Sequence, residues 1–188
     1  MESIIDGSQL GHIMVDLETL STGSNAAILS IGAVEFDLTT GRTGRTFYLN
    51  VDLQSCMDAG LKIDGRTVYW WFKREAEARL PLLENPVHIA AALQSFSEFV
   101  LTCGGKEAQL WGNSARFDLG KLDDAYSACT LPVPWSFRNE RDVRTLVAFA
   151  PHIKDQEPRI GTHHHAVDDC YHQISYCVKT WRYLQSPL

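Results

Sequence analysis

The spacing of apolar and polar positions in the first fifty residues is typical of β-strands. Two apolar, partly β-branched runs cover residues 11–18 and 27–37, and an alternating run covers residues 45–51. Thr39, Thr40 and Gly41 predict a turn ahead of the third run. Three consecutive strands with short connections indicate an antiparallel meander.

Beyond residue 60 the apolar period becomes helical, with short strands between the helices. The expected elements are helices at residues 68–80 and 87–101, a strand at 109–112, a helix at 115–129, a strand at 135–138, a helix at 143–150, a loop at 154–162 and a helix at 165–184. The last helix is the clearest, because one apolar stripe runs along it: Ala166, Cys170, Ile174, Cys177, Trp181 and Leu184.

This order of elements predicts an α/β fold in which helices pack on a mixed sheet. A length of 188 residues with 45% apolar residues fits a single domain over residues 1–188. Five cysteines without a CxxC pair argue against a disulfide framework and a zinc ribbon. No leader pattern and no run of roughly 20 apolar residues occur, so we expect a soluble cytoplasmic protein that does not contact a membrane.

The net charge of the chain bears on whether it can bind nucleic acid. A formal net charge of −6 argues against binding nucleic acid, whose affinity usually comes from Lys and Arg. The objection weakens if the acidic side chains are gathered around divalent cations, because bound cations present positive charge to phosphates.

Asp16 and Glu18 lie two residues apart at the end of the first predicted strand, so their side chains point to the same side. Two adjacent acids on a central strand repel each other and resist desolvation unless a cation compensates them. Mg²⁺ or Mn²⁺, which prefer carboxylate oxygens, are the natural candidates. The alternative is an exposed strand end with two solvated acids.

Two further acids lie on predicted helices. Asp118 falls on the flank of its helix's apolar stripe, where a side chain can look into a cleft beside the sheet, although a charge at a helix N-terminus needs no ligand. On the last helix, Asp169 lies roughly 100° and Asp168 roughly 160° from the centre of the apolar stripe at Cys170. Asp169 is therefore expected to border the core and Asp168 to face solvent.

These acids and their surroundings resemble the DEDDh exonuclease superfamily, which includes ribonuclease T, oligoribonuclease and bacterial proofreading subunits. The motif D-x-E matches Asp16-Leu17-Glu18, and N-x-x-x-F/Y-D matches "NSARFD" with Asn113, Phe117 and Asp118. The motif H-x-x-x-x-D matches "HHAVDD" with His164 and Asp169. Longer stretches, such as "YWWFKREAEARL", look most like the small phage-type subgroup of exonuclease DexA and related bacterial exoribonucleases.

The resemblance implies a ribonuclease H-like fold with five strands, and a 3′-5′ exonuclease that acts through two divalent ions, Mg²⁺ or Mn²⁺. Asp16 is implied to bridge both ions, Glu18 and Asp169 to complete one site, Asp118 to act mainly at the other, and His164 to accept the proton of the attacking water. The partner is nucleic acid with a free 3′ end, with single-stranded DNA slightly favoured over RNA. A homodimer is left open, because several relatives are dimers. The alternative is an inactive nucleic-acid-binding module of the same fold.

Substrate contacts are expected from two segments. By resemblance, Thr19 and Leu20 meet the sugar and base of the terminal nucleotide. Trp70 and Trp71 belong to an aromatic run, Tyr69–Phe72, that is followed by Lys73 and Arg74 and offers a stacking platform or part of the core. Three arginines extend a basic track or form a solvated face: Arg138, Arg141 and Arg144.

The histidine run allows two other interpretations. His163 and Asp168 also satisfy the third motif, in a register shifted by one residue. His165, Asp169 and His172 share one helix face, where imidazoles can bind a transition metal. The helical wheel favours the register with His164, which falls on a loop just before the helix.

Overall fold

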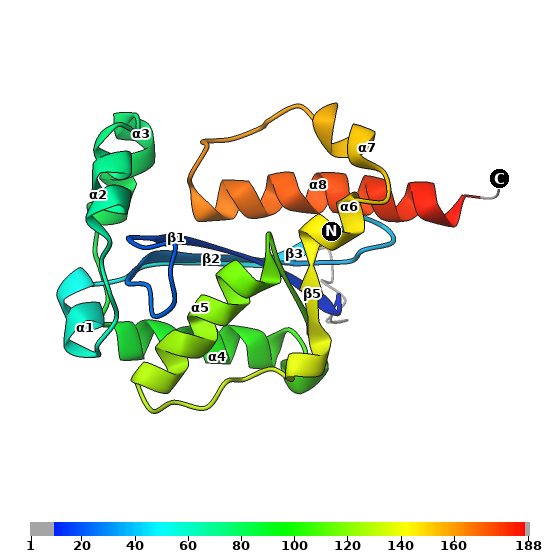
Figure 1. Ribbon diagram of the computed structural model, residues 1–188. Coiled ribbons are helices and arrows are strands. Elements are labelled where there is room, and N and C mark those ends of the chain that lie inside the picture. The colour runs from blue at the N-terminus through cyan, green and yellow to red at the C-terminus, as the bar shows by residue number, and fades with distance from the viewer. Residues whose placement is uncertain (1–9, 187–188) are drawn as a thin grey trace, which may run out of the picture.

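A computed structural model describes residues 10–186 of the chain. Its centre is a five-stranded sheet in the order β3-β2-β1-β4-β5, shown in Figure 1. The strands are β1 (His12–Thr19), β2 (Ile28–Phe36), β3 (Thr43–Asn50), β4 (Gln109–Gly112) and β5 (Glu140–Asp142). The first three strands pair antiparallel, whereas β4 pairs parallel to both β1 and β5, so the predicted meander and mixed sheet are confirmed.

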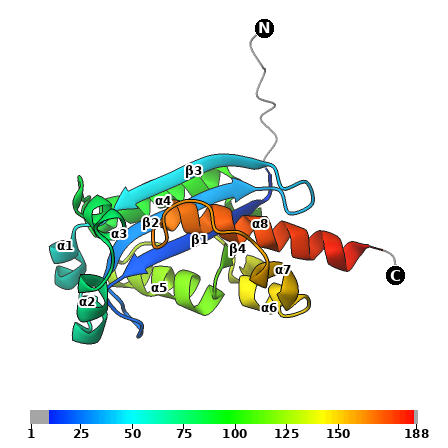
Figure 2. The ribbon, with the colours of Figure 1, turned by 90° about the horizontal axis from the view of Figure 1, so that it is seen from above.

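Helices cover both faces of the sheet, as Figures 1 and 2 show. Helices α4 (Ile89–Thr102) and α5 (Ala115–Ala128) cover one face, and α6 (Val143–Val147) and α8 (Ala166–Gln185) cover the other. Strand β1 alternates between the two cores, because Ile13, Val15 and Leu17 pack on the side of α4 and α5 while Met14 packs on the side of α8. The alternation places Asp16 and Glu18 on the α8 side.

The remaining elements are short. Helices α1 (Leu53–Asp58), α2 (Gly65–Phe72) and α3 (Ala76–Arg79) and the 3₁₀ helix η1 (Leu80–Leu83) follow β3, and α2 and α3 lie near the end of the sheet where β1 ends (Figure 2). The others are η2 (Gly105–Glu107), η3 (Phe137–Asn139) and α7 (Pro151–Asp155). Among residues 10–186, no helix has both the length and the apolar character that crossing a bilayer requires.

The helix predicted over residues 68–80 is wrong in one respect, because the chain breaks between α2 and α3. Arg74 folds back at the break, where its Nε donates to the carbonyl of Trp70 and its guanidinium lies 4.4 Å from the centre of the Trp70 ring. The Nε of Arg79 donates to the carbonyl of Arg74 at 2.8 Å. The carbonyl of Trp70 also accepts from the N–H of Lys73, so a backbone donor and a side-chain donor together cap the end of α2.

The strand predicted at residues 135–138 is also wrong, because the fifth strand begins at Glu140. Ser136 starts a turn instead, since its hydroxyl accepts from the N–H of Arg138 and its carbonyl from the N–H of Asn139. Trp135 is buried against the rings of Phe96 and Tyr126. Two boundaries also shift: the predicted loop at 154–162 begins inside α7, and the helix predicted at 143–150 ends at Val147.

The N-terminus of α8 lies directly on β2, at Gly32. A Cβ at Gly32 would come within 2.6 Å of the Cβ of Ala166 and 2.7 Å of its carbonyl carbon, so only glycine permits this approach. Gly32 is also the partner of Asp16 in the β1–β2 register. The close packing of helix and sheet therefore sets the first turn of α8 beside Asp16. Four residues of the predicted α8 stripe are buried, namely Ala166, Cys170, Ile174 and Cys177, whereas Leu184 is exposed.

Candidate active site

Strand β1 supplies two acids to a cavity of about 500 Å³. Glu18 is 6% exposed, and Asp16 accepts a hydrogen bond at 2.8 Å from the Nε2 of Gln173 on α8. Gln173 is itself buried, and its Oε1 has no hydrogen-bond partner. Both β1 acids are therefore held inside the fold, which excludes the exposed strand end considered as their alternative.

Asp118 reaches the cavity because β4 is short. Strand β4 pairs with β1 only as far as Met14, so the N–H of Leu17 remains available and donates to the Oδ1 of Asp118 at 3.3 Å. The N–H of Asn113 donates to the Oδ2 at 2.9 Å. Gly112 permits the approach, since a Cβ there would lie 3.1 Å from the carboxylate. Asp118 is only 2% exposed, which is far more buried than a solvated acid at a helix N-terminus.

The first turn of α8 separates its two acids. Asp169 is buried and lines the cavity, as the helical wheel predicts. Asp168 lies outside the cavity, and its Oδ2 accepts from the N–H of Thr162 at 2.7 Å. The expectation that Asp168 simply faces solvent is too coarse, because about one third of its side chain is exposed and its carboxylate fastens the preceding loop.

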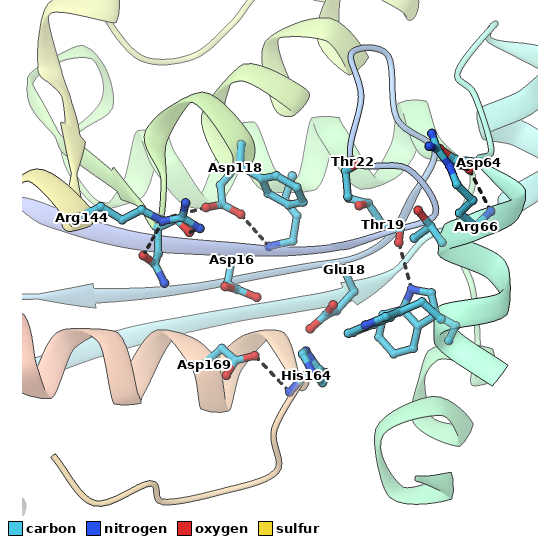
Figure 3. Close-up of a pocket in the computed structure, with 16 residues that line it drawn as sticks. Asp16, Glu18, Thr19, Thr22, Asp64, Arg66, Asp118, Arg144, His164 and Asp169 are labelled. Atoms are coloured by element: carbon cyan, nitrogen blue, oxygen red, sulfur yellow. Dashed lines mark hydrogen bonds and ion pairs between the residues drawn. The ribbon is translucent and has the colours of Figure 1, made fainter. Parts of the chain in front are cut away.

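His164 enters the cavity from that loop, as Figure 3 shows. Its N–H donates to the Oδ2 of Asp169 at 3.1 Å, and its φ is 66°. The ring stands edge-on to Trp70 at 4.8 Å and to Trp71 at 6.0 Å between ring centres. Within residues 10–186, Glu18, His164 and Asp169 bring one potential ligand atom each to within 4.8 Å of one another.

Burial raises the pKa values of three acids in the cavity, and repulsion by neighbouring carboxylates adds to this for two of them. Desolvation raises the pKa of Asp16 well above its ordinary value, and the charges of Asp118 and Asp169 raise it further. Glu18 is raised well above its ordinary pKa by burial and then by Asp16. Burial also raises the pKa of Asp118 to about 7, although two backbone N–H groups favour its ionised form. The pKa of His164 is lowered by burial and by His163, so its ring is neutral at neutral pH.

The donor set fits hard divalent cations. Carboxylates from β1, α5 and α8 line one cavity, which Figure 3 shows. The raised pKa values of Asp16, Glu18 and Asp118 show that the fold alone compensates these three acids poorly. The transition-metal interpretation finds no support in the described part of the chain, because neither His165 nor His172 joins the ligand cluster. His165 instead stacks on Tyr48 with the ring centres 4.8 Å apart. In the shifted register, His163 also lies outside the cavity.

The walls of the cavity hold most of the predicted substrate-binding residues. Thr19, Trp70, Trp71, Asn113 and Phe117 all line it. The Nε1 of Trp71 donates to the carbonyl of Thr19 at 3.0 Å, which places this buried ring as a support for the end of β1.

Leu20 does not line the cavity, because its side chain packs with Trp71 and Leu82 in a small apolar cluster. Of the proposed basic track, Arg144 lines the cavity and donates to Asn113, whereas Arg138 and Arg141 do not reach it.

Several lining or supporting residues carried no signal in the sequence. Asp64, Arg66 and Thr67 from the start of α2 form part of the wall. Arg159 pairs with Asp169 from a loop whose path no periodicity specifies. Gln173 is different, because it lies four residues after Asp169 on the same helix face, and a wheel drawn around Asp169 identifies it.

Residues 11–181 match the model of a family described as the 3′-5′ exoribonuclease Rv2179c-like domain. None of the curated proteins compared with the chain is similar enough to match it.

Solved structures of nucleases share the fold. Cell-death related nuclease 4 (CRN-4) superposes with a TM-score of 0.68 at 14% identity, over 92% of this chain and 64% of that one, so the chain spans less than two thirds of this neighbour. The nuclease domain of 3′hExo, a DEDDh family member bound to rAMP, gives 0.67 at 12% identity over 92% of each chain. Pop2p of S. pombe, in a form with Mg²⁺ and Mn²⁺ bound, gives 0.62 at 15% identity over 95% of this chain and 86% of that one. These likenesses confirm the predicted ribonuclease H-like fold.

Proposed function

The chain belongs to the Rv2179c-like 3′-5′ exoribonuclease domain family, and from this premise we propose that it removes nucleotides from the 3′ end of single-stranded nucleic acid with two divalent metal ions. The match to this family supports the predicted metal-dependent exonuclease, and the fold shared with a DEDDh family member agrees with it. The single observation that carries the proposal is the convergence of Asp16, Glu18, Asp118, His164 and Asp169 on one cavity.

Asp16, Glu18, Asp118 and Asp169 would hold the metal ions. When bound, such a pair of ions lowers the pKa of water, neutralises the charge that develops on the phosphate and assists the departure of the 3′ oxygen. A hard, all-oxygen donor set in a buried cavity supports Mg²⁺ or Mn²⁺ over softer metals.

His164 is proposed to accept the proton of the attacking water. Its lowered pKa leaves a ring nitrogen free for that proton at neutral pH. The water oxygen then bonds to phosphorus, the bond between phosphorus and the 3′ oxygen breaks, and a proton completes the new 3′ hydroxyl. Trp70, together with the N–H contact to Asp169, keeps the ring at the cavity edge.

The aromatic walls support a single-stranded substrate. Trp70 and Phe117 offer ring faces or edges for unstacked bases, and Arg144 and Arg66 bring positive charge to the same cavity. The family description names RNA, and the 3′hExo nuclease domain was solved bound to rAMP. We therefore propose RNA as the preferred substrate, in place of the single-stranded DNA that the sequence slightly favoured.

Matched 5′-labelled RNA and DNA oligomers test the proposal when each is offered with a free or a blocked 3′ end in the presence of Mn²⁺. We expect free-ended RNA to shorten one nucleotide at a time, DNA to shorten more slowly and blocked oligomers to persist. Internal cuts in the blocked oligomers would contradict an exonuclease. Tight binding without any cleavage would favour the alternative, an inactive binding module.

A further inference from the structure

The loop over residues 156–165 is fastened to the active site and to α8 by separate contacts. At its start, Glu157 accepts from the hydroxyl of Ser175 and from the ammonium of Lys179, both on α8. At its end, His164 donates to Asp169. Between these points, Arg159 turns inward toward the acids.

Arg159 forms an ion pair with the Oδ1 of Asp169, and its Nη2 also donates to the carbonyl of Thr162 at 3.0 Å. Because the N–H of His164 donates to the Oδ2 of the same carboxylate, both oxygens of Asp169 are engaged by this one loop. The Arg159 side chain is 28% exposed, and its Nε is buried without a hydrogen-bond partner. Arg159 is therefore held by Asp169 and Thr162 rather than by solvent.

We propose that Arg159 is an internal counter-cation of the acid cluster, which competes with the divalent metal for Asp169 and so couples metal occupancy to the loop that carries His164. The inference rests on the proposed function, because it takes Asp169 as a metal ligand. Arg159 is a positioning residue in this scheme, since it acts through Asp169.

The physical reason is the charge balance of the site. Four carboxylates that share one cavity need compensating positive charge, and the charge of Arg159 favours the ionised forms of both Asp16 and Glu18. A divalent cation on Asp169 meets repulsion from the adjacent guanidinium, and it either shares the carboxylate or displaces Arg159. Displacement of Arg159 from Asp169 would remove one of the contacts that hold the loop over residues 156–165.

Two readouts on the purified full chain test the inference without measuring nuclease activity: Mn²⁺ affinity by calorimetry, and Tm with and without saturating Mn²⁺. We expect Arg159→Gln to bind Mn²⁺ about threefold or more tighter than the wild type, because a like charge beside the site is removed. Without metal its Tm should fall by about 5 °C at neutral pH, and saturating Mn²⁺ should reduce that difference.

Lys179→Gln is the matched control. It removes another ion pair that anchors the same loop, but Lys179 contacts Glu157 rather than the acid cluster. We expect its Tm to fall in the presence and in the absence of Mn²⁺ alike, with unchanged Mn²⁺ affinity. Arg159→Lys keeps the charge and should retain an affinity close to that of the wild type.

Weaker Mn²⁺ binding by Arg159→Gln would overturn the inference, because Arg159 would then support the metal site instead of competing for it. A loss of Tm that saturating Mn²⁺ leaves unchanged would overturn it as well. A wild-type chain that binds no Mn²⁺ would sink both this inference and the proposed function, whereas normal Mn²⁺ binding with unaltered affinity in the variant sinks the inference alone.

Discussion

Asp168 and Asp169 are neighbours on α8 with different partners. This difference predicts that the same substitution abolishes activity at one position and largely preserves it at the other. Asp169 lines the cavity, while Asp168 accepts from the N–H of Thr162 outside it. Asp16→Asn and Asp169→Asn should abolish nucleotide release, because an amide is a much poorer ligand for a hard cation than a carboxylate. Asp168→Asn should keep most of the activity, since an amide oxygen can still accept from Thr162.

The measurement is the initial rate on 5′-labelled RNA with Mn²⁺, accompanied by Tm values that verify folding. Equal loss of activity from Asp168→Asn and Asp169→Asn would show that the third motif has been placed in the wrong register.

Gln173 is the second residue whose substitution tests the candidate active site, because it contacts that site only through Asp16. Its Nε2 fixes one carboxylate oxygen of Asp16, so Gln173→Ala should lower Mn²⁺ affinity or activity by roughly 10- to 100-fold, the range found for residues that orient metal ligands. Calorimetry with Mn²⁺ and steady-state rates measure the two effects. Gln173→Glu should be at least as harmful, because it puts a further acid beside Asp16 in place of a hydrogen-bond donor. A variant that behaves like the wild type would contradict this role.

Three of the acids that the sequence identified lie at positions that the period of a strand or a helix fixes. Asp16 and Glu18 follow from strand alternation and Asp169 from the helical wheel, and all three lie where the periods place them. Arg159 could not be found in this way, because it sits in a loop whose conformation depends on tertiary contacts. Leu20 was assigned by resemblance alone, and in this chain its apolar side chain packs against Trp71 instead.

At the scale of elements, Gly32 controls where α8 meets the sheet. Gly32→Ala would place a Cβ within 3 Å of both Ala166 and the backbone of Val167, which forces the N-terminus of α8 away from β2. We expect a loss of about 1–3 kcal/mol in the free energy of unfolding, typical of overpacking, and a larger relative loss of activity as Asp169 moves away from Asp16. Urea unfolding and steady-state rates measure the two quantities.

The double variant Gly32→Ala with Ala166→Gly provides the control. It removes the Cβ of Ala166 but leaves the backbone atoms at 2.7 Å and 2.9 Å, so rescue should be incomplete. Full recovery of stability and activity would show that side-chain crowding alone, and not backbone proximity, sets the position of α8.

The elements themselves were predictable where hydrophobic period decided them. The runs at residues 11–18 and 109–112 and the last helix were placed closely, because burial on one or both faces fixes their pattern. The break after Phe72 and the turn at Ser136 were missed, because each depends on side-chain-to-backbone hydrogen bonds that no period encodes. Because of this break, α2 ends two residues after Trp70, whose ring contacts that of His164.

At the scale of the whole molecule, acidic side chains are concentrated at buried positions, where desolvation makes the ionised form of a carboxyl most costly. The net charge of −6 includes the clustered carboxylates of Asp16, Glu18, Asp118 and Asp169, of which the first three have raised pKa values. A folded-state pKa above the unfolded value means that the folded protein binds more protons, so stability falls as the pH rises through that interval. Asp118 should therefore lower the stability of the metal-free chain as the pH rises from about 4 to about 7, the interval between the ordinary pKa and the folded-state pKa of its carboxyl.

Histidines with lowered pKa values act in the opposite direction near about pH 6.5, because the unfolded chain protonates them more than the folded chain does. The contribution of Asp118 is therefore read as the difference between the pH slopes of the wild type and of Asp118→Asn. Each raised carboxyl that titrates in the window contributes about 1.4 kcal/mol per pH unit at most. Urea unfolding of the EDTA-treated chain at several pH values measures the slope, and Asp118→Asn should reduce it. Saturating Mn²⁺ should remove the carboxyl contribution to this slope, because the metal binds deprotonated ligands and the folded and unfolded chains then carry the same number of carboxyl protons. A slope that is the same with and without Mn²⁺ would mean that the cavity acids do not ionise around a cation.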